Sequence, residues 1–154
     1  MPTALLTLLP LALQPLALQP LKTLLITGFA LLHLVGPVPA ELGVHDGSLS
    51  PCPSPAHCAR SDWRVQAPEA ALQALVPVLE AMPRTQVLEA SSTYLHATNS
   101  SALFGFVDDL ELYADSARGV LQARSVSRLG DSDLGVNARR LAALQAALPA
   151  HTTP

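Results

Sequence analysis

The chain has 154 residues, of which 49% are hydrophobic and only 14% are charged, and its net charge is −3. A weakly acidic chain without a basic run excludes general nucleic-acid binding, which needs a strongly basic surface. The shortage of charge is local, because Lys22 is the only charged side chain before Glu41. We therefore predict a hydrophobic segment over residues 1–40 and one globular domain over residues 41–154.

The first 40 residues have the composition of an export signal or a membrane anchor. Lys22 precedes an apolar run over residues 23–38, which is short for a helix that spans a bilayer. Val38 and Ala40 fit the small residues of a signal-peptide cleavage site. Cleavage and retention as an anchor both stay open, and both place residue 41 onward outside the cytoplasm. We expect an exported protein of the cell envelope, either secreted or held on the membrane by this segment.

Two cysteines, Cys52 and Cys58, enclose a short proline-containing loop. Two cysteines alone in an exported chain are expected to form a disulfide. Free thiols are one alternative, and a metal site that adds His57 and His96 is another, although the spacing is not that of a zinc knuckle. We predict a disulfide, no metal site and no cofactor.

The domain begins with an irregular lead-in over residues 41–63, which is rich in Gly, Pro and Ser. A helix is predicted over residues 68–82, because a proline begins it and leucines recur at helical spacing. Alternating patterns then predict four strands, with a hairpin between the last two. The predicted strands cover residues 86–90, 93–97, 104–113 and 120–129.

A final helix places Leu141, Leu144 and Leu148 on one face, with Asp133 or Asn137 as its N-terminal cap. The order of elements predicts a two-layer α+β domain. We expect a small antiparallel meander of about four strands with two helices on one face, preceded by the N-terminal hydrophobic export or anchor segment.

Several stretches of the domain form a recognisable pattern. They are Pro51–Pro55, Tyr94–Ala97, Phe104–Glu111, Arg124–Gly130 and Ser132–Asn137. With these motifs in this order, the chain from Gly43 to Leu148 resembles the domain-of-unknown-function family 1499 (DUF1499). The resemblance implies an N-terminal hydrophobic segment, which members commonly carry, and it implies no established activity.

Strand alternation sorts the polar residues of the predicted hairpin. Asp108 shares its face with leucines, whereas Asp109 and Glu111 point to the other face. Pairing across the hairpin places Arg124 beside Asp108 or Asp109, depending on the register. We interpret Asp108, Asp109 and Arg124 as a structural polar cluster, because a buried carboxylate needs a cationic partner.

Arg128, Arg139 and His96 are the candidate ligand-binding residues. Arg128 lies at the end of the last predicted strand, and Arg139 lies near the start of the final helix. The positive charge of Arg139 near the helix start opposes the helix dipole. Free amides at a helix N-terminus attract anions. The sequence therefore predicts a non-enzymatic binding or structural module that holds an anionic small molecule or an envelope partner.

A hydrolase is the alternative function. His96 would act as the base for Ser125 or Ser127, with Asp109 orienting the imidazole. No nucleophile-elbow motif surrounds either serine. The two functions differ in geometry, because catalysis requires His96 within hydrogen-bond reach of a serine hydroxyl in an open cleft.

Overall fold

The computed structural model describes residues 35–149, so most of the predicted export segment lies outside the described residues. The elements in chain order are β1 (Val44–His45), β2 (Ser48–Leu49), β3 (Cys58–Arg64), α2 (Pro68–Ala81), β4 (Thr85–Ala90), β5 (Tyr94–Ser100), β6 (Val107–Asp115), β7 (Val120–Ser127) and α3 (Val136–Ala146). Within residues 35–149, neither helix has the length and apolar composition needed to cross a bilayer.

Five strands form one antiparallel sheet in the order β3-β7-β6-β5-β4. The α+β class is confirmed, and β4 to β7 are the predicted meander. Within this sheet, the strand that the sequence did not predict is β3, most of which lies inside the predicted irregular lead-in. Its helix-facing positions are Ala59, Ser61 and Trp63, so only one bulky apolar side chain marks the alternation.

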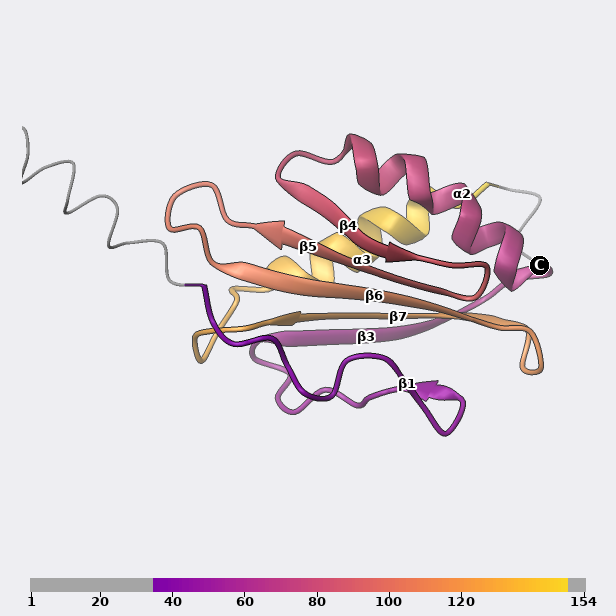
Figure 1. Ribbon diagram of the computed structural model, residues 1–154, viewed down its shortest axis with the longest axis horizontal. Helices are drawn as coiled ribbons and strands as arrows, with labels where there is room; N and C mark the ends of the chain where they lie inside the picture. The colour runs from indigo at the N-terminus through magenta and orange to yellow at the C-terminus, as the bar shows by residue number, and fades with distance from the viewer. Residues whose placement is uncertain (1–34, 150–154) are drawn as a thin grey trace, which may run out of the picture. The chain divides into compact units, whose positions relative to one another are not determined.

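Both helices pack on the same face of the sheet. Leu72 and Leu75 from α2 and Leu141 from α3 join one buried cluster with Leu112 and Leu121 from the central strands. The predicted helix over residues 68–82 is confirmed as α2, which begins at a proline in its first turn. Figure 1 shows α2 above the sheet and the segment that carries β1 below it.

The opposite face of the sheet is covered by residues 41–50, which we call the strap. The strap contains the β1–β2 hairpin, and Leu49 is buried within it. The Leu49 amide and the Ser48 hydroxyl both donate to Gln122 Oε1 of β7, each at 3.0 Å. These bonds, together with the contacts that β2 makes with β6 and β7, make the strap a third layer of the domain.

Residues just before the strap also pack on the sheet. Gly36 is buried at the end of β7, where a Cβ would lie 2.7 Å from Leu129 Cγ and 2.9 Å from the Arg128 carbonyl oxygen. Only glycine permits so close an approach of the backbone. Described residues upstream of residue 41 therefore also contact the sheet.

The predicted disulfide is present and joins the loop after the strap to the first residue of β3. Cys52 and Cys58 have Cα atoms 5.5 Å apart, and no free cysteine remains. Sulfur atoms bonded to each other cannot act as thiolate ligands, so the metal and free-thiol alternatives do not describe this structure.

Replacing both cysteines by serine should lower the free energy of unfolding by about 2 kcal/mol, because a short closed loop restricts the unfolded chain only modestly. Thermal unfolding of the full chain measures the change. In the wild-type chain, a thiol reagent should find no reactive group under denaturing, non-reducing conditions. Two reactive thiols in that assay would contradict the disulfide.

Candidate functional site

Strand β6 carries four buried acidic side chains. Asp115, at the end of the strand, pairs with Arg118 of the following turn. The other three lie on two faces of the sheet. Asp108 points toward the helices with Leu110 and Leu112, and Asp109 and Glu111 point toward the strap. An ionised carboxylate inside a protein is costly unless a cation and hydrogen-bond donors compensate it. Each of these three carboxylates has a different arginine as its partner.

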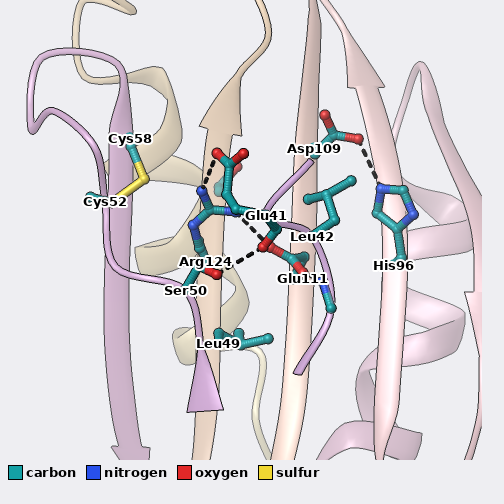
Figure 2. Close-up of polar contacts among 12 residues, drawn as sticks. Glu41, Leu42, Leu49, Ser50, Cys52, Cys58, His96, Asp109, Glu111 and Arg124 are labelled. Atoms are coloured by element: carbon teal, nitrogen blue, oxygen red, sulfur yellow. Dashed lines mark hydrogen bonds and ion pairs between the residues drawn. A yellow bond between two sulfur atoms is a disulfide. The ribbon is translucent and has the colours of Figure 1, made fainter. Parts of the chain in front are cut away.

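The first cluster joins the sheet to the strap. Arg124 and Glu111 are both 0% exposed, and Arg124 Nη1 donates to Glu111 Oε2 at 2.7 Å. Arg124 Nη2 donates to Glu41 Oε1 of the strap at 3.1 Å. The Tyr94 hydroxyl and the Gly43 amide donate to Glu111 Oε1 at 2.9 and 2.6 Å. Figure 2 shows Arg124 between Glu41 and Glu111, beneath the strap.

The predicted pairing of Arg124 with Asp108 or Asp109 is wrong. The register of β6 and β7 places Glu111 directly opposite Arg124. Burial, and then the charge of Glu111, raise the pKa of Tyr94, so its hydroxyl stays protonated and donates to the carboxylate.

The second cluster lies on the same face, closer to the ends of the strands. Arg128 Nε and Nη2 donate to the two oxygens of Asp109, both at 2.8 Å, and His96 Nε2 lies 2.8 Å from Asp109 Oδ1. Burial raises the pKa of Asp109, but hydrogen bonds from Arg128 and His96 outweigh it, and the net pKa is lowered. Arg128 and His96, predicted as ligand residues, thus hold an internal carboxylate.

The third cluster lies between the sheet and α3. Arg140 Nη2 donates to Asp108 Oδ2 at 2.7 Å, and its Nη1 donates to Ser125 Oγ and Asn137 Oδ1, both at 2.7 Å. The Ser127 hydroxyl donates to Asp108 Oδ1 at 2.6 Å. Sequence reasoning did not assign Arg140 as the partner of Asp108. The signal was present, because Asn137 and Arg140 recur at the helical spacing of the buried leucines of α3.

The predicted hydrolase triad is not assembled. His96 and Asp109 lie on the strap face, whereas Ser125 and Ser127 lie on the helix face of the same sheet. The sheet separates the serine hydroxyls from the imidazole, and both hydroxyls bond to residues of the third cluster. This geometry rules out a proton transfer between His96 and either serine.

The structure also does not bring the predicted anion-binding groups together. Asp133 Oδ1 and Oδ2 accept the amides of Gly135 and Asn137 at 2.7 and 2.9 Å. The N-cap residue of α3 is Gly135 and not the predicted Asp133 or Asn137. Burial raises the pKa of Asp133, but these amide bonds outweigh it and lower the net pKa. Arg139 is exposed and donates to the Leu134 carbonyl oxygen at 3.0 Å. The amides predicted to attract an anion therefore already hold the carboxylate of this chain.

An apolar pocket of about 430 Å³ opens between the loop over residues 101–106 and the loop over residues 128–135. We call it the loop pocket. Its apolar lining residues are Ala102, Leu103, Phe104, Phe106, Leu129, Leu134 and Val136. Asp108 and Ser127 line it from the sheet, and Asp133 lines it from the second loop. The third cluster thus forms one wall of this pocket.

A second hollow of about 570 Å³ lies beside the disulfide, between β3 and α3. Its charged lining residue is Arg60, whose Nη2 donates to Ser48 and Gln122 at 2.9 and 2.8 Å. Leu141 is the one large apolar side chain that lines it, so this hollow offers a ligand fewer apolar contacts than the loop pocket.

The fold and the clusters define a small α+β domain whose antiparallel sheet is covered by two helices on one face and by a strap on the other. The chain belongs to the family described as Protein of unknown function (DUF1499), whose family model matches residues 48–148. This match confirms the resemblance found in the sequence. No curated protein and no solved structure matches the chain.

Replacing Arg124 by Met should lower the free energy of unfolding by about 3–5 kcal/mol, because Glu111 would remain buried without its cation. Urea unfolding of the full chain measures the loss. The matched control is Arg139→Met, which alters an exposed arginine and should change stability by less than about 0.5 kcal/mol. The double variant R124M/E111M should recover much of the loss. Equal losses of stability in R124M and R139M would contradict the role of Arg124 as the cation that compensates buried Glu111.

Stability should fall in acid, because the carboxyl groups of Asp109, Asp115 and Asp133 have lowered pKa values. The unfolded chain therefore binds protons more readily than the folded chain. The stabilisation that these three ionised carboxylates give the folded chain is present above the unfolded pKa of about 3.9, and it is lost as the pH drops through the pKa values of the folded chain. Urea unfolding at a series of pH values below about 5 measures the decline. Asp109→Asn should make the decline shallower, and an unchanged slope would contradict the role of Asp109.

Proposed function

We propose that this chain is an exported, membrane-tethered binding domain that takes a mostly apolar small molecule with one hydrogen-bond donor into the loop pocket. The observation that carries the proposal is the composition of this pocket, which combines apolar side chains from two loops with acceptor oxygens of Asp108 and Ser127 from the sheet. Ligand sites in proteins commonly have this form, an apolar concavity with few polar groups.

The electrostatics of the pocket favour a neutral ligand over an anion. Two of its lining residues, Asp108 and Asp133, are carboxylates, and no lining residue is basic. Arg140 compensates Asp108, and the amides at the start of α3 compensate Asp133. A second negative charge in the pocket would have no cationic partner among its lining residues, whereas a hydroxyl group would find an acceptor in Asp108.

The location rests on the N-terminal segment and the disulfide. A disulfide between Cys52 and Cys58 is compatible with an oxidising compartment outside the cytoplasm. Packing of Gly36 against the end of β7 supports an uncleaved tether, because cleavage after Ala40 would remove this contact. We therefore propose that the domain stays attached through residues 35–40 to the hydrophobic segment.

A photoactivatable medium-chain alcohol that carries a diazirine tests the pocket on the full chain in lipid nanodiscs. Crosslinked peptides should map to residues 101–106 and 128–136. Ala102→Phe should reduce labelling several-fold, because Ala102 is an exposed lining residue whose enlargement fills the pocket. The matched control is Ala142→Phe, the same change at an exposed alanine of the hollow beside the disulfide.

The corresponding fatty acid should label the pocket less than the alcohol, because Asp108 and Asp133 repel its carboxylate. Labelling that is spread over the domain, or that Ala142→Phe reduces as much as Ala102→Phe does, would contradict the proposed pocket. Stronger labelling by the fatty acid would contradict the proposed neutral ligand.

A further inference from the structure

Most of the large exposed apolar side chains of residues 35–149 lie at one end of the domain. They are Val35, Leu103, Phe104, Leu134 and Val136. Leu134 is 84% exposed and Leu103 is 72% exposed, and both line the loop pocket. Large apolar side chains that gather in an exposed part of a folded domain mark a contact site. We call this set the apolar end.

The apolar end is also the place where the chain enters the described domain. Gly36 packs beside Leu129, and Leu129 lines the loop pocket with Leu103 and Leu134. Figure 1 shows the chain entering at the end where β5 connects to β6 and where β7 ends. Immediately upstream, residues 23–34 continue the apolar run without a charged residue. The described chain therefore begins at the end of the domain that carries these exposed side chains, and the apolar run precedes it in the sequence.

We propose that the apolar end rests on the surface of a lipid bilayer, with Leu103, Phe104 and Leu134 inserted among the lipid headgroups and upper acyl chains. Leucine and phenylalanine side chains bind membrane interfaces by burying apolar area in this layer. The tether holds the domain beside a bilayer, which raises the effective concentration of the weaker second contact. This surface contact is separate from the tether and separate from binding in the loop pocket.

The charges near the apolar end are compatible with this contact. Arg139 is exposed beside Leu134, and its guanidinium has no carboxylate partner among the described residues. Arg84 is exposed next to the loop over residues 101–106, where its Nε donates to the Ser100 carbonyl oxygen at 3.0 Å. Arginines that flank an apolar surface suit the phosphate groups of lipids.

Tryptophan fluorescence of the full chain reconstituted in phosphatidylcholine vesicles tests the contact. The only native tryptophan, Trp63, is buried in the core, so the signal of an added tryptophan is the difference from the wild-type chain. In the variants Leu103→Trp and Leu134→Trp, the emission of the added tryptophan should shift to shorter wavelength in vesicles. Lipids brominated near the headgroup should quench most of this emission. Both changes alter exposed side chains, and thermal unfolding checks that each variant is folded.

The matched control is Val44→Trp, because Val44 is an exposed apolar residue of β1 at the other end of the domain. Its added emission should stay unquenched. Equal quenching at positions 44 and 134, or quenching at neither position, would overturn the proposal. Quenching at position 134 should also persist in the Ala102→Phe background. If it disappears there, lipid enters the loop pocket without surface contact, and the proposed pocket function stands while this inference fails.

Discussion

Strand β6 lies in the middle of the sheet and buries four carboxylates, three of which are neutralised by arginines from distant parts of the chain. The pairs are Asp108 with Arg140, Asp109 with Arg128 and Glu111 with Arg124. An unpaired carboxylate in this interior would cost several kcal/mol, so β6 can be buried only when α3 and β7 are in place. A slip of one residue would move each carboxylate to the opposite face, away from its arginine. The ion pairs thereby fix the register of the sheet.

The secondary structure was predictable where the hydrophobic period is strong. The leucines of α2 and α3 and the alternation of the later strands gave the α+β class, both helices and the four-strand meander. Strand β3 was not predictable in the same way, because its stability comes from pairing with β7 and from Trp63 rather than from its own pattern. The strap was missed for a related reason, since polar bonds to Gln122 and Glu111 hold it.

The faces of the polar residues were predictable, but their partners were not. Alternation correctly separated Asp108 from Asp109 and Glu111. The predicted hairpin ended its first strand at Tyr113, whereas β6 continues to Asp115. Asp115 accepts hydrogen bonds from the amide of Arg118 and from Gln122, which shortens the turn between the strands. A turn two residues shorter keeps every side chain on its face and moves each partner by two positions, from Asp109 to Glu111 opposite Arg124.

The buried ion pairs belong to the structural part of the domain, and the part available for function lies elsewhere. Asp109 and Glu111 have their hydrogen bonds within the chain on the strap face, so a ligand there would have to replace a buried pair. Loops at one end of a rigid sheet do not carry this cost, and binding residues are commonly found on such loops. The loops over residues 101–106 and 128–135 expose apolar side chains next to a wall that Arg140 holds in place. The ionic interior therefore acts as the scaffold, and recognition is expected where the strands end.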